Sequence, residues 1–482
     1  MTNAHELFHQ WLGDLVTAES WSNLTVNESF ADYSQLLWFE YKYGQDYAGY
    51  ENYNQMQQYL RSPDVNKDLV RFYYNDKEDM FDRVSYNKGG RILNMLRNFV
   101  GDDAFFKSLN EYLTANKFGN GSGVKLRLAF EKVTGKDLNW FFNQWYFGSG
   151  HPKLEISYGY DIPTQTSKVY IKQTQTGEKL FKLPVAIDIY NGSSKKRYTV
   201  WAENKADTFS FPVSSKPDLI DVDADKVILA DKKEDKTLAE YIHQYTYAGK
   251  YLDRREAIDF AAKNVSDAAA YNLLVKALSD PYFRIRGRAI TSFGTAKLDA
   301  ATISKLESIT KNDDHRVVSA AAIDALAKLN NNSYKDFFTK ASMDSSYSVA
   351  GAALDALAAL DGTEAFKIAN SLSKDNNKGR LAGVITNTFI KYGDESAFDV
   401  IASNIEKMPL SQAKFQAIGP YIEFLSKVTN MQNFKKGVDM VVAFREQIPG
   451  NSKAQTDPFI NGALKSLADK KETAGAKEMA DY

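Results

Sequence analysis

Four aspartates recur at near-constant intervals late in the chain, and this repeat constrains the fold more than any other sequence feature. Asp280, Asp313, Asp344 and Asp375 are separated by steps of 33, 31 and 31 residues. An apolar, helix-forming segment follows each of them. Because one short helix pair cannot bury its apolar face alone, successive pairs are expected to stack into a solenoid. Residues 231–482 are therefore predicted to form an all-helical repeat domain.

The repeat is similar in kind to HEAT repeats, although its spacing is slightly shorter. The charged segment Asp231–Lys236 precedes it and is interpreted as a linker.

Residues 151–230 have the two-residue period of β-strands. Apolar and polar side chains alternate in several short segments, and Asn191-Gly192 is a strong hairpin signal between two of them. We predict a small antiparallel β-sandwich. The basic run Lys195-Lys196-Arg197 is interpreted as a solvated loop tip in preference to a binding patch.

Residues 1–150 are rich in aromatic side chains and have mainly helical spacing. Together, the three stretches 1–150, 151–230 and 231–482 predict a multidomain α+β protein.

Composition excludes some functional classes. Lys and Arg total 60 against 61 for Asp and Glu, which gives a net charge of -1 and no global field that would favour nucleic acid. There is no cysteine, so neither disulfides nor thiolate metal ligands are available. No apolar run has transmembrane length. We expect neither a nucleic-acid partner nor a membrane span. A cytoplasmic location and an exported, periplasmic one both remain open, and the oligomeric state is unknown.

The residues His5-Glu6-Leu7-Phe8-His9 carry the clearest chemical signal. Two histidines four residues apart on a helix point in the same direction, so both imidazoles can reach one metal ion. Glu6 lies beside them as a candidate general base, and this His-Glu-x-x-His pattern is the helix motif of zinc metallopeptidases. A third protein ligand is needed to complete a catalytic zinc site.

Glu28 follows His9 after eighteen intervening residues, within Asn27-Glu28-Ser29-Phe30-Ala31. With this spacing and the flanking Gln10-Trp11, the chain resembles the aminopeptidase N family of zinc metallopeptidases, of the gluzincin type. The resemblance implies that residues 1–150 are the helical half of a thermolysin-like catalytic domain. It also extends to the β-sandwich and the helical repeat domain that follow.

The resemblance implies a role for each matching residue. His5, His9 and Glu28 would bind one zinc ion. Glu6 would accept a proton from the zinc-bound water and pass it to the leaving amine. Tyr86, in Val84–Gly90, matches the tyrosine that stabilises the tetrahedral oxyanion of the family, although a buried core tyrosine is the alternative interpretation.

Asp32 lies four residues after Glu28 on the same helical face. One hypothesis is that it accepts the second ring N–H of a ligand histidine. A plain surface or helix-start aspartate is the alternative.

The sequence also departs from the family pattern. Ser29 stands where the family usually has glycine, a change expected to adjust local packing without touching a ligand. No copy of the family's Gly-x-Met-Glu-Asn motif is present, whose glutamate grips the substrate's free amine. The chain therefore looks like a truncated form of the parent enzyme, equivalent to its C-terminal portion.

Two functions follow. The first is a zinc-dependent aminopeptidase that releases N-terminal residues from peptide substrates. The second is a protein-binding helical-repeat scaffold with a vestigial zinc site. A site that has lost its catalytic function tends to lose its general base or a metal ligand. Neither is lost here, which favours the enzyme.

Overall fold

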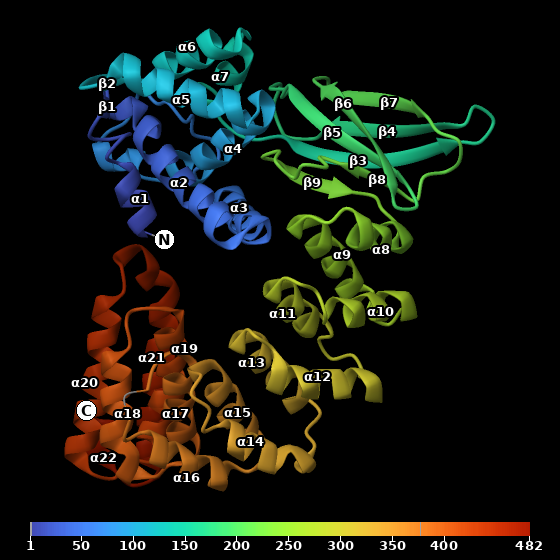
Figure 1. Ribbon diagram of the computed structural model, residues 1–482. Coiled ribbons are helices and arrows are strands. Elements are labelled where there is room, and N and C mark those ends of the chain that lie inside the picture. The colour runs from blue at the N-terminus through green and yellow to red at the C-terminus, as the bar shows by residue number, and fades with distance from the viewer. Residues whose placement is uncertain (1, 376) are drawn as a thin grey trace. The chain divides into compact units, whose positions relative to one another are not determined.

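The computed structural model describes residues 2–375 and 377–482, which divide into two compact units, Met1–Leu273 and Leu274–Tyr482 (Figure 1). The first unit contains a helical part, a β-sandwich and three further helices. The second unit is helical throughout its described residues. The predicted multidomain α+β organisation is confirmed, whereas the three predicted ranges 1–150, 151–230 and 231–482 stay predictions.

The helical part of the first unit is built around one long central helix, α2. Its regular elements are α1 (Thr2–Phe8), β1 (Val16–Ala18), η1 (Trp21–Asn23), α2 (Thr25–Tyr43), α3 (Gln45–Leu60), η2 (Lys77–Met80), η3 (Val84–Lys88), α4 (Gly89–Val100), α5 (Asp102–Asn116), β2 (Gly119–Gly121), α6 (Gly123–Thr134) and α7 (Asn139–Trp145). Helix α2 contacts α1, α3, α4 and η3. Its buried face includes Phe30, Tyr33 and Leu36, which belong to a core shared with the sandwich. Because apolar residues recur at helical spacing on this face, burying it fixes α2 in the core.

Two sheets form the sandwich, as the alternating pattern predicted. One sheet has the strand order β7-β4-β3-β9 and the other β6-β5-β8. The strands are β3 (Lys153–Asp161), β4 (Thr166–Gln173), β5 (Leu183–Asn191), β6 (Ser194–Ala202), β7 (Ala206–Pro212), β8 (Leu219–Val222) and β9 (Asp231–Glu234). The predicted hairpin joins β5 to β6, where Asn191 pairs with Ser194 and Gly192 takes a positive φ of 57°.

The interpretation of Asp231–Lys236 as a linker was wrong. Residues 231–234 form strand β9, which pairs in parallel with β3. The charges on its buried side are neutralised, because the Lys232 ammonium lies 2.9 Å from a carboxylate oxygen of Asp223. Charged side chains are compatible with a buried strand when each one has a partner of opposite sign.

The interpretation of the basic run Lys195–Arg197 as a solvated loop tip was also wrong. It lies within strand β6 and is not a loop tip. Lys195 and Arg197 both pair with Asp188, whose side chain is 1% exposed. The run therefore neutralises a buried carboxylate of the neighbouring strand.

Three helices complete the first unit: α8 (Leu238–Tyr247), α9 (Tyr251–Lys263) and α10 (Ala268–Ala277), the last of which reaches into the second unit. Helix α8 contacts strand β8, and α9 contacts α3.

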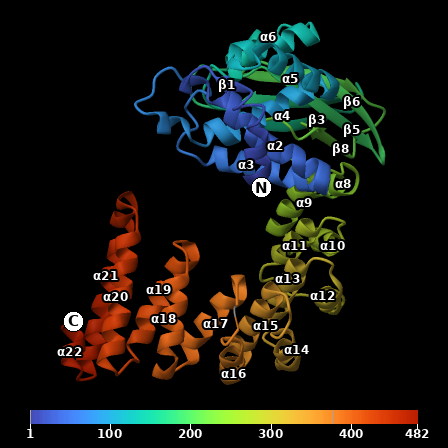
Figure 2. The same ribbon diagram turned by 60° about the vertical axis from the view of Figure 1, so that its left-hand side comes forward.

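Paired helices form the second unit. They are α11 (Phe283–Ser292), α12 (Ala300–Asn312), α13 (Arg316–Ala327), η4 (Asn332–Tyr334), α14 (Lys335–Ala341), α15 (Tyr347–Leu360), α16 (Gly362–Leu372), α17 (Gly379–Tyr392), η5 (Glu395–Ala397), α18 (Phe398–Lys407), α19 (Gln412–Leu425), α20 (Met431–Gln447), α21 (Gly450–Thr473) and α22 (Lys477–Ala480). Helices α13, α15, α17, α19 and α21 contact one another in that order and follow one another in Figure 2. This stacking is the predicted solenoid.

Two of the repeated aspartates, Asp313 and Asp344, link neighbouring repeats. A side-chain oxygen of Asp313 accepts a hydrogen bond from the His315 amide at 2.8 Å, which turns the chain into α13. The Arg286 guanidinium of the preceding repeat also donates to Asp313, at 2.7 and 2.8 Å. Arg316 contacts Asp344 in the same way, at 2.5 Å. The repeat thus encodes both the turn and the contact to the next helix pair.

Among the described residues, no helix combines the length and apolar character that a membrane span requires.

Candidate metal centre and active site

His5 and His9 come from the first helix and the turn that follows it. The sequence predicted both histidines on one helix, but α1 ends at Phe8, so His9 lies one residue beyond it. The His9 ring nitrogen Nδ1 lies 3.0 Å from the Leu12 carbonyl oxygen, which orients the other nitrogen, Nε2, away from the backbone. Gly13 permits this arrangement, because a Cβ there would lie only 2.7 Å from the His9 carbonyl oxygen.

Glu28 lies in the first turn of α2. The partial positive charge of a helix N-terminus favours a carboxylate at this position. Val26 and Phe30, on either side of it in sequence, are buried in the core. The helix is therefore fixed by packing while Glu28 faces the two histidines.

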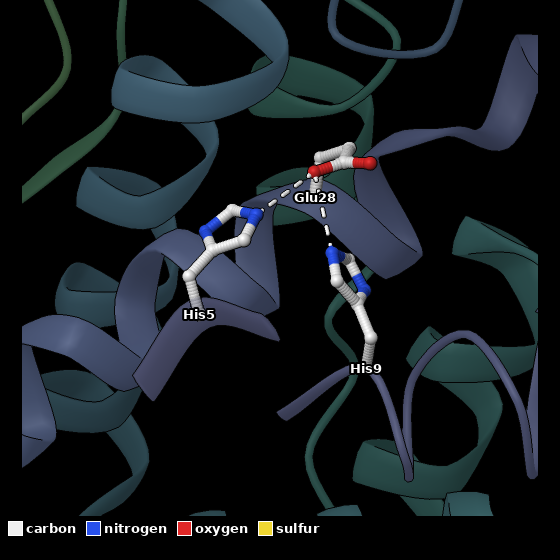
Figure 3. Close-up of side chains that lie close together, drawn as sticks. All are labelled: His5, His9 and Glu28. Atoms are coloured by element: carbon white, nitrogen blue, oxygen red, sulfur yellow. Dashed lines mark ion pairs between the residues drawn. The ribbon is translucent and has the colours of Figure 1, made fainter. Parts of the chain in front are cut away.

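The three side chains converge on one point (Figure 3). The Oε2 atom of Glu28 lies 3.3 Å from Nε2 of His5 and 3.6 Å from Nε2 of His9. All three potential ligand atoms lie within 4.8 Å of one another. Tetrahedral ligand atoms about 2.1 Å from a zinc ion are about 3.4 Å apart. Two imidazoles and one carboxylate at these separations fit a zinc ion.

The electrostatics of the cluster follow from these contacts. Burial alone would raise the pKa of Glu28, but hydrogen bonds from His5 and His9 outweigh it and lower the pKa to about 2. The hydrogen bond to Glu28 raises the pKa of His9 to about 9, against the opposing effect of burial. The Glu28 carboxylate thus stays ionised, and a divalent cation that binds to these three side chains must displace the proton from His9.

Tyr86 lies at the same centre, on the π-helical turn η3. Its ring stacks on the His5 imidazole, with centroids 6.0 Å apart and an angle of 16° between the planes. Burial, followed by the charge of Glu28, raises the pKa of Tyr86 well above its ordinary value of 10.0. The phenol thus keeps its proton over the whole physiological range and can donate a hydrogen bond.

Glu6 is exposed on α1, between the two histidines in sequence. Its negative charge contributes to raising the pKa of both His9 and Tyr86. The charge of Glu6 therefore acts on both of these side chains, and its role as a base stays a prediction.

Asp32 lies close to His5, but the side-chain amide of Gln35 lies between them. The Gln35 side-chain nitrogen is 3.2 Å from Nδ1 of His5 and 3.2 Å from Oδ1 of Asp32. Burial raises the pKa of Asp32 to about 6. The predicted contact of Asp32 with a ligand histidine thus runs through Gln35, which sequence reasoning missed. Its one signal was its position seven residues, or two helical turns, after Glu28.

A second group of potential ligands, Asp313-Asp314-His315, lies in the solenoid. Its members already have partners, because Arg286 binds both aspartates and the His315 ring lies 3.0 Å from Asp314. The His5 cluster is therefore the stronger metal centre.

Comparison with known proteins agrees with this geometry. Residues 1–145 match the peptidase family M1 domain, and residues 242–327 match HEAT repeats. The chain resembles the M1 peptidases. The resemblance to the aminopeptidase N family that the motifs predicted is thereby confirmed.

Several of the relatives are named as aminopeptidases. The chain is 28% identical over 213 residues to probable aminopeptidase 1 of Sulfurisphaera tokodaii, which covers 43% of this chain and 27% of that protein. It is 26% identical over 456 residues to aminopeptidase 2 of Candida albicans, which covers 89% of this chain and 48% of that protein. The chain thus spans half the length or less of these two relatives.

A solved structure has the same fold. The aminopeptidase A of Legionella pneumophila, crystallised with aspartic acid, is similar with a TM-score of 0.64 at 13% identity. The match covers 99% of this chain and 64% of that one. This chain therefore resembles the fold of that solved structure over nearly its whole length.

Proposed function

We propose that this chain provides the zinc centre and the catalytic groups of an aminopeptidase, which removes N-terminal residues from peptides. The observation that carries the proposal is the convergence of His5, His9 and Glu28, with both ring nitrogens within 3.6 Å of one carboxylate oxygen. The match to the M1 peptidase domain and the names of the relatives support the same activity.

His5, His9 and Glu28 would hold the metal. A zinc ion in such a site polarises the peptide carbonyl and lowers the pKa of a coordinated water to about 7. His9 is kept in the required tautomer by the Leu12 carbonyl, which accepts the Nδ1 proton at 3.0 Å and leaves Nε2 free for the metal.

Glu6 and Tyr86 perform the proton transfer and the charge stabilisation. Glu6, exposed beside the ligands, accepts a proton from the attacking water and returns it to the leaving amine. Tyr86 keeps its phenolic proton and donates a hydrogen bond to the oxyanion that develops as the carbonyl becomes tetrahedral. The two residues belong to separate elements, α1 and η3, so each can be removed without deleting a ligand.

Zinc content and turnover, measured on the same samples of this chain, test the proposal. The wild type should contain about one zinc per chain and His5→Ala should contain none, because a site with two remaining protein ligands binds zinc weakly. His315→Ala is the matched control, since it removes a histidine from the second group of potential ligands and should retain the zinc.

Turnover of an aminoacyl amide distinguishes an active aminopeptidase from a chain that binds zinc without activity. Zinc with turnover would establish the activity in this chain. Zinc without turnover would assign the metal centre to the chain and make the peptidase activity dependent on further residues. A wild type without zinc would contradict the proposal and favour the scaffold function.

A further inference from the structure

A buried hydroxyl joins the element that holds Glu28 to the element that holds Tyr86. Ser29, directly after Glu28 in α2, is 1% exposed. Its hydroxyl donates a hydrogen bond of 2.6 Å to the backbone carbonyl of Ser85. Ser85 directly precedes Tyr86 in the π-helical turn η3. One hydrogen bond therefore connects the neighbour of the metal ligand with the neighbour of the phenol.

The direction of this hydrogen bond is fixed. The Ser85 carbonyl can only accept, so the Ser29 hydroxyl uses its single proton for this contact. The Thr25 hydroxyl lies 2.6 Å from the Ser29 oxygen and must then be the donor to it. The Ser29 hydroxyl is thus satisfied both as donor and as acceptor, which gives it one orientation.

The opposite side of the turn is anchored independently. A carboxylate oxygen of Asp82 accepts hydrogen bonds from the amides of Val84 and Ser85, at 2.9 and 3.0 Å. Arg71 binds both the Asp82 carboxylate and the Ser85 hydroxyl, at 3.0 and 3.2 Å. The Ser85 hydroxyl in turn donates to the Met80 carbonyl at 2.5 Å. Ser29 adds a buried hydrogen bond between this anchored turn and α2.

The fit between the two elements is close. A Cβ at Gly89 would lie 1.8 Å from the Ser29 hydroxyl oxygen and 2.5 Å from its Cβ. The Ser29 side chain therefore fills the space that Gly89, the first residue of α4, leaves open. The end of η3 is held against α2 by this contact as well as by the hydrogen bond.

We propose that Ser29 is a positioning residue, which holds the Tyr86 phenol at a fixed place relative to the metal ligand Glu28. The inference rests on the proposed function, because it concerns the contact of Tyr86 with the oxyanion. Tyr86 lies on a single π-helical turn, a rare departure from the α-helix that is frequent at functional sites. Misplacing a catalytic group by about 1 Å can reduce rates by about 10²-fold.

The test measures the binding of a tetrahedral anion rather than turnover. A dipeptide phosphonate carries such an anion in place of the scissile amide and should contact both zinc and Tyr86. Ser29→Ala should weaken its binding about tenfold, while the zinc content stays at the wild-type value. In a Tyr86→Phe background, the same substitution should change the phosphonate Kd by less than about twofold, because the group it positions is absent.

Ser108→Ala is the matched control. Ser108 is also a fully buried serine, but its hydroxyl bonds the Ala104 carbonyl within its own helix, α5. This variant should leave the phosphonate Kd unchanged. If Ser29→Ala does not fold, Ser29→Gly combined with Gly89→Ala refills the same space without a hydroxyl and replaces it in the test.

The outcomes distinguish the positioning role of Ser29 from the proposed function of the chain. An equal loss of phosphonate affinity in the wild-type and Tyr86→Phe backgrounds would overturn the positioning role, since the loss would not act through Tyr86. If Ser108→Ala loses as much phosphonate affinity as Ser29→Ala, the role of Ser29 would be structural and not specific to Tyr86. A wild type that binds neither zinc nor phosphonate would instead refute the proposed function, and the inference would fail with it.

Discussion

The contact between Ser29 and Gly89 gives a sharp prediction about stability. Gly89→Ala places a methyl group 1.8 Å from the Ser29 oxygen, far inside the 3.5–4.0 Å at which unbonded carbon atoms normally meet. Such overpacking costs about 3 kcal/mol, from which the better helix propensity of alanine recovers about 1 kcal/mol. Gly89→Ala alone should therefore lower the free energy of unfolding by about 2 kcal/mol.

Ser29→Gly removes the cause of this clash. On its own it loses one buried hydrogen bond and some helix propensity, which together cost about 1.5 kcal/mol. In the double variant, the atom nearest to the new methyl is Cδ1 of Leu69, at 3.4 Å, an ordinary contact. The double variant should then be about 0.5 kcal/mol less stable than wild type, and the two changes should be coupled by about 3 kcal/mol.

Urea unfolding followed by tryptophan fluorescence measures these values in the relevant unit. The chain has six tryptophans, and all of them lie in the unit Met1–Leu273: Trp11, Trp21, Trp38, Trp140, Trp145 and Trp201. The signal therefore reports the unit that contains Ser29 and Gly89, while the helices after residue 274 contribute none of it.

Gly123→Ala is the matched control, because Gly123 is the first residue of α6, as Gly89 is of α4. A Cβ there would meet its nearest neighbour, Cδ1 of Tyr146, at 3.4 Å. Its effect should be small and should add to that of Ser29→Gly. The reasoning is refuted if Gly89→Ala is as well tolerated as Gly123→Ala, or if the effects of Ser29→Gly and Gly89→Ala simply add.

Three further predictions concern single side chains. Glu6→Gln should keep zinc bound and abolish turnover, because an amide cannot accept the proton; retained turnover in a zinc-loaded sample would exclude Glu6 as the base. Tyr86→Phe should lower kcat by about 10²–10³-fold with little change in KM, since one oxyanion donor is lost, and steady-state kinetics that changed KM alone would restrict Tyr86 to binding substrate. Burial lowers the pKa of His151 from its ordinary 6.5 to about 4, with Nδ1 3.3 Å from the Tyr59 hydroxyl. Because the unfolded chain takes up this proton at a higher pH than the folded one, wild type should lose stability as the pH falls from 6.5 to 4. In urea titrations, the free energy of unfolding of His151→Gln should fall by about 1–2 kcal/mol less than that of wild type over this pH range, after allowance for the partial exposure of His151. An identical pH dependence of the two proteins would contradict the lowered pKa of His151.

Local periodicity made most of the elements predictable from the sequence. Alternation identified strands β3 to β6, and the spacing of the aspartates located the start of successive helix pairs. The residues of the candidate metal centre were predictable for a different reason. Zinc accepts few ligand types, and a helix brings two of them together only at a fixed spacing.

Charged segments were misread because composition does not show how the fold pairs each charge. Asp231–Lys236 has the composition of a linker, yet Lys232 is neutralised by Asp223 and Lys236 by Glu234. Lys195 and Arg197 are likewise neutralised by the buried Asp188 of the preceding strand. A one-dimensional pattern cannot indicate burial when it is the fold that brings the compensating charge into contact.

The residues that hold the site in place were the least predictable part of it. The chemistry proposed for positions 5, 6, 9, 28 and 86 allows few side chains, whereas the space between α2 and the start of α4 can be filled from either side. A serine at position 29 requires glycine at position 89, and a glycine at position 29 leaves room for alanine at position 89. Each solution is separated from the other by two substitutions that are harmful alone. The departure at Ser29 is therefore understandable only together with Gly89, sixty residues away.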